Sequence, residues 1–296
     1  MTTRLIEWTG ERCVPWTDDV QIVYEHLHRY HFAAPYVDSK RVLDLGSGEG
    51  YGAALLARTA AEVVGVDIDP ASVEHSRRTY DGRPNLTFLE GSIADLGRFE
   101  AASFDVAVCF ETIEHVDDHE AVVDEIARVL TPDGLLFLST PDRDVYSPAG
   151  RHNPFHAREL NRSELTSLLA RSFSEVAFWG QTASAGSFMR LLEGAAAEDE
   201  VQTVFVARDD ENGWAAGDPP PPTYLVAVAG RTTIPLLPAT SALVDPAREV
   251  VAVERRERDE QARLAQERDR VLRAMLDSTS WRLTAPLRWL KARLVR

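Results

Sequence analysis

The chain has 296 residues, of which 44% are hydrophobic, and this is enough for a full buried core in a soluble globular protein. Its net charge of −15 argues against a nucleic-acid substrate, because phosphate binding depends on clustered lysine and arginine side chains. No apolar run approaches the roughly 20 residues that span a bilayer, and the N-terminus lacks the layout of a secretion signal, so a cytoplasmic location is expected.

Short β-branched runs alternate with helix-length segments from about residue 41 to residue 180. This alternation predicts repeated βα units and therefore a parallel sheet in an α/β fold. The expected strands are 42–45, 63–67, 86–90, 105–110, 135–139 and 176–179, with a last strand at 224–229 after a long irregular stretch. The expected helices are 53–58, 70–79, 120–130 and 163–171.

The composition divides the chain into five parts. These are an N-terminal helical lid over residues 1–40, the α/β domain over 41–232, a linker over 233–247, a charged helix over 248–277 and a basic tail over 278–296. The charged helix carries Leu264, Val271 and Met275 at intervals of seven and four. This spacing fits either a short coiled coil, which would make the protein a homo-oligomer, or a solvated single helix.

The most specific motif is a glycine-rich turn after the first expected strand. Gly46, Gly48 and Gly50 lie between that strand and a helix, where the backbone can approach a ligand closely and the helix N-terminus presents free N–H groups. A dinucleotide-binding loop would place its third glycine at position 51, which is Tyr51. The carboxylate of Asp44, two residues before the first glycine, instead suits a ligand with a cationic amino group and no phosphates.

Asp67 ends the second expected strand, 21 residues after Gly46. In a doubly wound sheet a carboxylate at this position reaches the two hydroxyls of a ribose. Asp69 lies one step further into the loop, and we expect it to be the N-cap of the helix that begins at Pro70.

Four further side chains complete the expected cofactor site: Ile68, Ser92, Ile93 and Phe110, with Ser92 and Ile93 placed to contact an adenine. With these motifs, residues 42–178 resemble the class I S-adenosylmethionine (SAM)-dependent methyltransferases, in the branch of the ubiquinone-biosynthesis O-methyltransferases. The resemblance implies SAM as cofactor and a Rossmann-like, seven-stranded sheet whose last strand is antiparallel, here followed by a C-terminal helical extension. Many relatives have Asp where this chain has Ser92.

A second polar cluster follows the fourth expected strand. If a helical turn begins there, Glu111, Glu114 and His115 share one face at the same edge of the sheet as the cofactor. His152 and His156 lie in a later polar loop and are candidates for acid–base catalysis or metal binding. The alternative is that these side chains only cap the helix and bond to the loop backbone.

The Glu-x-x-Glu-His sequence with a later histidine is similar to the divalent-metal site of the small-RNA 2′-O-methyltransferases. This resemblance implies that Glu111, Glu114, His115 and His156 hold a divalent cation, for which magnesium is the expectation. The catalytic candidates are Glu111, His156 and His152, and His152 is the candidate general base if no metal is bound.

The acceptor is suggested by the N-terminal segment. Residues 10–12 and 24–30, together with the 152–156 stretch, are similar to methyltransferase domains of bacterial O-antigen and polysaccharide synthesis. The resemblance implies a saccharide acceptor and a helix over the cofactor, in which His28, Arg29 and Tyr30 contact the cofactor carboxylate or the sugar. An ordinary amphipathic helix explains these three residues equally well. The alternative functions are an O-methyltransferase of a small phenol or quinol, and a non-catalytic SAM-binding partner in a biosynthetic complex.

The tail, residues 278–296, differs chemically from the rest of the chain. It holds five basic residues and no acidic ones, with Leu287, Leu290 and Leu294 at helical spacing. Such a helix suits an anionic membrane surface, which would place the protein peripherally at the inner face of the membrane. The string Ser-Trp-Arg-Leu-Thr-Ala-Pro-Leu-Arg also resembles a tail of bacterial envelope-polysaccharide glycosyltransferases, and docking onto such a partner enzyme is the alternative.

Overall fold

The computed structural model describes residues 6, 12–17, 19–148, 153–184, 203, 205–209 and 213–245, and separate residues between 256 and 275. It divides into two compact units, Met1–Val244 and Asp245–Arg296. In the second unit the described residues are helical and exposed from residue 256 onward. His152 and the tail 278–296 lie outside the described residues.

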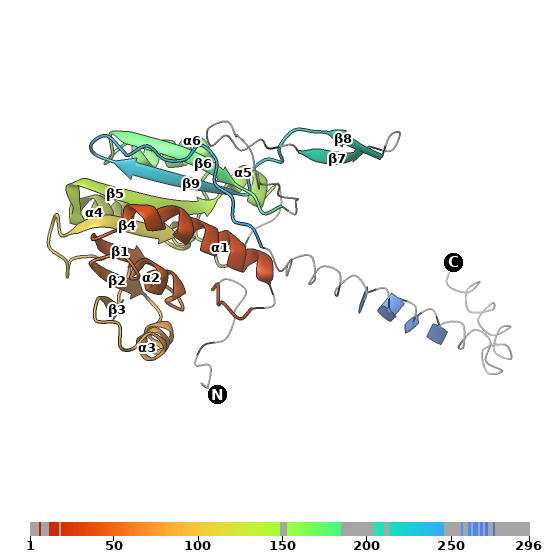
Figure 1. Cartoon of the computed structure of the whole chain (residues 1–296), viewed down its shortest axis with the longest axis horizontal. Coiled ribbons are helices and arrows are strands. Elements are labelled where there is room, and N and C mark those ends of the chain that lie inside the picture. Colours follow the sequence, from red (N-terminus) through yellow and green to blue (C-terminus); the bar gives the residue numbers. More distant parts are fainter. Residues whose placement is uncertain are drawn as a thin grey trace, which may run out of the picture. The chain divides into compact units, whose positions relative to one another are not determined.

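A seven-stranded sheet forms the centre of the first unit (Figure 1), in the order β3-β2-β1-β4-β5-β9-β6. The strands β3, β2, β1, β4 and β5 pair in parallel, whereas β9 runs antiparallel to both β5 and β6. The strands are β1 (Arg41–Leu45), β2 (Glu62–Asp67), β3 (Leu86–Glu90), β4 (Phe104–Phe110), β5 (Leu130–Pro141), β6 (Glu175–Gln181) and β9 (Tyr224–Gly230). The expected seven-stranded sheet with an antiparallel last strand is therefore confirmed.

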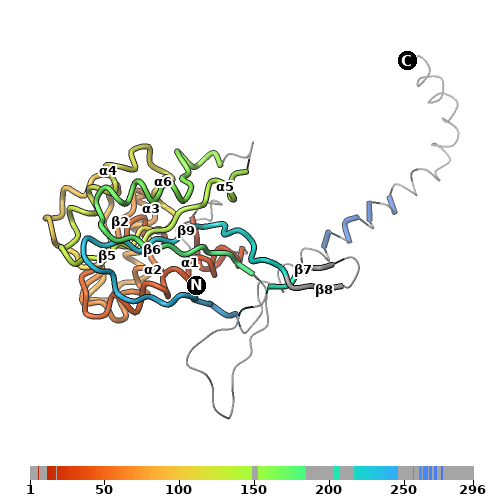
Figure 2. The backbone as a smooth tube through the Cα atoms, turned by 90° about the horizontal axis from the view of Figure 1, so that it is seen from above, coloured from red at the N-terminus to blue at the C-terminus, as the bar shows by residue number. Residues whose placement is uncertain are grey.

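Helices cover both faces of this sheet (Figure 2). The α-helices are α1 (Val20–Ala33), α2 (Tyr51–Leu56), α3 (Pro70–Thr79), α4 (His119–Val129), α5 (Arg143–Tyr146) and α6 (Arg162–Leu169). Side chains of α4 and α6 pack in one core cluster, and side chains of α1 and α2 pack in another on the opposite face. Because both faces are covered, β1 and β4 read as nearly continuous apolar runs rather than alternating ones.

The expected helices and strands all occur, with ends that differ by a few residues. The helix α2 begins at Tyr51, earlier than expected, because Gly50 adopts a left-handed conformation (φ 94°) that turns the chain directly into the helix. The short hairpin of β7 (Val206–Asp209) and β8 (Gly213–Ala216) was not expected, since it lies within the stretch that reads as irregular. None of the described helices is long and apolar enough to cross a membrane.

Candidate functional site

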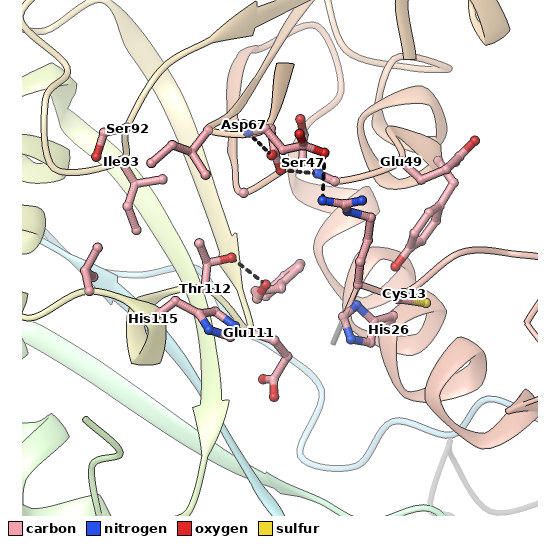
Figure 3. A pocket seen from close by; sticks show the side chains of 18 of the residues that line it. Cys13, His26, Ser47, Glu49, Asp67, Ser92, Ile93, Glu111, Thr112 and His115 are labelled. Atoms are coloured by element: carbon pink, nitrogen blue, oxygen red, sulfur yellow. Dashed lines mark hydrogen bonds and ion pairs between the residues drawn. The ribbon is translucent and has the colours of Figure 1, made fainter. Parts of the chain in front are cut away.

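A cavity of about 470 Å³ lies at the carboxyl ends of the central parallel strands, and its size is typical of small-molecule sites. Figure 3 shows Asp67 and Ser47 on one side of it and Glu111, Thr112 and His115 on the other. The expected cofactor contacts that line it are Gly46, Gly48, Asp67, Ile68, Ser92, Ile93 and Phe110. Asp44 and Gly50 are not among its lining residues.

The glycine-rich turn has a backbone that other residues rarely adopt. Gly46 and Gly48 have φ values of 73° and 52°, in the left-handed region. A Cβ atom on Gly46 would also collide with the side chain of Thr112. The N–H groups of Gly46 and Ser47 both donate to the carbonyl of Val66, at 2.8 and 3.0 Å, so the turn is tied to the end of β2.

Asp67 is held in place by two backbone amides. Its Oδ2 accepts a hydrogen bond from the N–H of Gly48 at 2.7 Å, and its Oδ1 accepts one from the N–H of Asp69 at 2.9 Å. The carboxylate therefore joins the glycine turn to the loop after β2 and presents its remaining lone pairs toward the cavity. Asp69 is the N-cap of α3, accepting from the N–H groups of Ala71 and Ser72, as predicted.

Asp44 lies behind the glycine turn rather than in the cavity. Its side chain is completely buried and accepts hydrogen bonds from the hydroxyl of Tyr30 at 3.0 and 3.2 Å. Burial raises the pKa of Asp44 to about 7. Direct contact with a cationic ligand was expected of Asp44, whereas the structure shows its carboxylate buried against Tyr30, which lines the cavity.

The three polar residues of α1 have different surroundings. Tyr30 lines the cavity and packs edge-on against Phe110. Arg29 is buried, donates to Gln181 at 2.7 Å and stacks over the ring of Tyr224. His28 bonds to Ser241 in the segment that follows β9. Of the three residues expected to contact the cofactor or the sugar, only Tyr30 is among the residues that line the cavity.

Glu111 is separated from the other expected metal ligands by its backbone. It has a φ of 47°, unusual for a residue with a side chain, and the 3-10 turn that follows spans Ile113–His115. The expected helical face therefore does not include Glu111. Its carboxylate instead accepts from Ser139 Oγ at 2.6 Å and forms an ion pair with Arg29 at 3.5 Å.

Glu114, His115 and His156 do come together, with one potential ligand atom from each within 4.8 Å of the others. His115 Nδ1 donates to the carbonyl of Phe155 at 2.9 Å, and His156 Nδ1 donates to Glu159 Oε1 at 2.7 Å. Both bonds leave the Nε2 atoms as lone-pair donors, which is the usual arrangement around metal-ligating histidines. In the structure the side-chain amide of Asn153 donates to His156 Nε2 at 3.1 Å, so a cation would have to displace this hydrogen bond.

The charge of this cluster also favours a cation. Glu114 is 1% exposed, and burial together with the charge of Glu111 raises its pKa well above the ordinary value. A divalent cation bound there would provide a positive partner for the negative charge of the Glu114 carboxylate. Two imidazoles and one carboxylate suit manganese, iron or zinc, while magnesium prefers oxygen ligands and keeps several waters.

Sequence reasoning missed Glu49, the acidic residue inside the glycine-rich turn. Its buried carboxylate accepts from Tyr80 at 2.7 Å and pairs with His75 Nε2 at 2.7 Å. Both partners belong to or follow α3, so Glu49 fixes the turn to that helix. The sequence did show a charged residue between two glycines. Its role could not be predicted, because the partners of Glu49 lie 26 and 31 positions away in sequence.

Residues 43–138 match the family model described as methyltransferase domain. A probable S-adenosylmethionine-dependent methyltransferase of Mycobacterium tuberculosis is 44% identical over 183 residues, which are 58% of this chain and 63% of that protein. The chain therefore covers somewhat less than two thirds of this relative. A ubiquinone biosynthesis O-methyltransferase of Hahella chejuensis is 39% identical over 109 residues, covering 36% of this chain and 46% of that protein.

Solved structures agree on the fold. The YcgJ protein of Bacillus subtilis superposes with a TM-score of 0.50 and 19% sequence identity, over 70% of this chain and 100% of that one. At this identity the likeness concerns the arrangement of helices and strands alone.

Proposed function

We propose that this chain, which belongs to the class I SAM-dependent methyltransferases, transfers the methyl group of SAM to a hydroxyl oxygen of a saccharide. The observation that supports SAM as the methyl donor is the Asp67 carboxylate, held by the Gly48 N–H at 2.7 Å beside the glycine-rich turn. Such a carboxylate offers two acceptors to the two ribose hydroxyls of the cofactor. The exposed side chain of Ile68, on the same rim, would cover the adenine.

The reaction needs few groups from the protein. The sulfonium of SAM is already activated, so the chain must hold the acceptor oxygen in line with the methyl group and help remove its proton. His115 lines the cavity and donates from Nδ1 to the carbonyl of Phe155, so when no cation is bound its Nε2 is the atom that can accept that proton. Glu111 and Thr112 lie beside it and can hydrogen-bond an acceptor hydroxyl.

A divalent cation fits the residues present. Glu114, His115 and His156 would hold it, with Glu159 orienting His156 from behind. When bound, such a cation lowers the pKa of a coordinated hydroxyl and fixes its oxygen. Glu159 then supports the site without touching the cation itself.

A small phenol or quinol is the second candidate acceptor, and the similarity to a ubiquinone biosynthesis O-methyltransferase favours it. The deciding experiment measures transfer of a labelled methyl group from SAM to mono- and oligosaccharides and to catechols and quinols, each with and without manganese. Methylation of saccharides alone supports the proposal. Methylation of the phenols alone would replace the saccharide, and absence of any turnover with intact SAM binding would support a non-catalytic partner.

A further inference from the structure

A second cleft, of about 770 Å³, lies between the start of α4 and the side of α6. It begins where the first cavity ends: Val116 lines the cavity and Asp117 lines the cleft. A second segment, the loop 155–158, lies at the same boundary: Phe155 lines the cavity and Arg158 lines the cleft. The two spaces therefore share the turn 116–117 and the segment 155–158 as a common rim.

This rim is held rigidly. The N–H groups of Ala157 and Arg158 both donate to the carbonyl of Glu114, at 2.8 and 3.1 Å, and the carbonyl of Phe155 accepts from His115. Although its backbone is fixed, the Phe155 side chain is 57% exposed. An aromatic ring held at the rim of a polar site offers an apolar face against which the C–H face of a sugar ring can pack.

His119 lines the cleft, and its ring lies next to the backbone of Val116 and Ile113, which can take up one of its hydrogen bonds. It is 3% exposed, and neither ring nitrogen has a hydrogen-bond partner among the described residues. Burial and the charge of Arg158 lower the pKa of His119, so the ring is neutral at neutral pH. A neutral imidazole offers one N–H and one lone pair, which is the complement of a hydroxyl group.

The charge of the cleft excludes an anionic ligand. Four acidic side chains line it, against two arginines, Arg158 and Arg171. Hydroxyl groups of Ser163 and Ser167 lie among them. A neutral ligand rich in hydroxyls meets such a mixture of donors and acceptors with fewest unpaired groups.

From these observations we propose that the cleft is a distal subsite that binds a further neutral sugar unit of an extended acceptor, while the reacting unit occupies the cavity. The inference rests on the proposed saccharide acceptor and extends it from a single sugar to an oligosaccharide. Phe155 lies on the rim between the two units, with His119 and Arg158 on the distal side.

The test measures KM for methyl transfer to α-linked gluco- and manno-oligosaccharides of one to six units, for the full chain and two variants. Arg158→Ala removes an exposed side chain of the cleft, and Arg162→Ala removes an exposed arginine of α6 that does not line it. We expect KM to fall at least tenfold as the acceptor grows beyond one unit. In Arg158→Ala most of this gain should be lost, whereas Arg162→Ala should keep it.

Equal KM values for short and long saccharides would overturn the distal subsite while leaving the proposed function intact. The same holds if Arg158→Ala and Arg162→Ala respond alike. If no saccharide of any length is methylated although calorimetry shows SAM bound, the saccharide acceptor itself is wrong and the subsite falls with it. Ligand-observed NMR with the four-unit saccharides of the same series, in the presence of S-adenosylhomocysteine, measures binding independently of turnover.

Discussion

The Arg29 guanidinium lies 3.5 Å from the Glu111 carboxylate, Nη1 to Oε1, in a region where the Arg29 side chain is 1% exposed. This pair connects α1 to the end of β4, so α1 is tied to the edge of the cavity. Neither terminal nitrogen of Arg29 has a hydrogen-bond partner among the described residues, which makes Glu111 its main compensation.

Replacing one partner of this ion pair should destabilise the fold more than replacing both partners together. Arg29→Met leaves a carboxylate uncompensated and should lower the free energy of unfolding by about 3 kcal/mol. Glu111→Gln should lose less than Arg29→Met, and the double variant should lose less than the sum of the two single losses. Urea unfolding of the four proteins measures the coupling, and strictly additive losses would show that the ion pair contributes nothing.

Replacing Asp67 should weaken SAM binding. Asp67→Ala is expected to raise Kd ten- to a hundredfold, because charge-assisted hydrogen bonds contribute about 1.5–3 kcal/mol each. Asp67→Asn keeps one oxygen to accept from Gly48 and should lose affinity with a smaller change in thermal stability. Asp81→Ala, an exposed aspartate outside the cavity, is the matched control. Calorimetry with unchanged Kd for Asp67→Ala would assign the ribose to another residue.

Manganese binding should depend on Glu114, His115 and His156. In titrations followed by the EPR signal of free Mn²⁺, Glu114→Ala and His156→Ala should abolish binding, and Glu159→Gln should weaken it about ten- to a hundredfold. Glu111→Gln should bind manganese nearly normally, because that side chain is engaged by Ser139 and Arg29. Methyl transfer that is indifferent to chelation, with no manganese bound to the parent protein, would remove the metal from the mechanism.

The buried carboxylate of Asp44 should make stability depend on pH. Its pKa is about 7 in the folded protein against 3.8 for an ordinary aspartate, so the folded state binds the proton more tightly than the unfolded chain. This contribution is present below pH 4 and is lost as the pH rises through 7, at about 1.4 kcal/mol per unit. Asp44→Asn should therefore become more stable relative to the parent as the pH rises from 4 to 7, with little further change above. A difference that does not change with pH would mean that Asp44 titrates normally.

The basic tail should determine association with anionic membranes. Truncation of residues 278–296 leaves 27 basic and 47 acidic residues, so the remainder should be repelled by such a surface. We expect the full chain to sediment with phosphatidylglycerol vesicles at low salt and the truncated chain to stay in solution, with equal Kd for SAM. A full chain that never binds these vesicles would favour docking onto a partner enzyme.

Local sequence patterns were sufficient for much of the fold and part of the site. The strands, the glycine-rich turn, the Asp69 cap and the position of Asp67 at a strand end all depend on periodicity or on residues close in the chain. These features were therefore predictable before any tertiary contact was known.

Tertiary contacts decided which polar side chains meet. Glu111 pairs with Arg29, 82 positions earlier in the chain, and its left-handed backbone keeps it out of the 3-10 turn that carries Glu114 and His115. Asp44 is covered by Tyr30 from α1, so a residue that reads as a ligand contact became buried support. His156 reaches His115 only because the loop that follows β5 folds back over the end of β4. Sequence by itself determined the scaffold and the cofactor edge. Long-range packing brought together Glu111 with Arg29 and His156 with His115, because these partners are separated by dozens of residues.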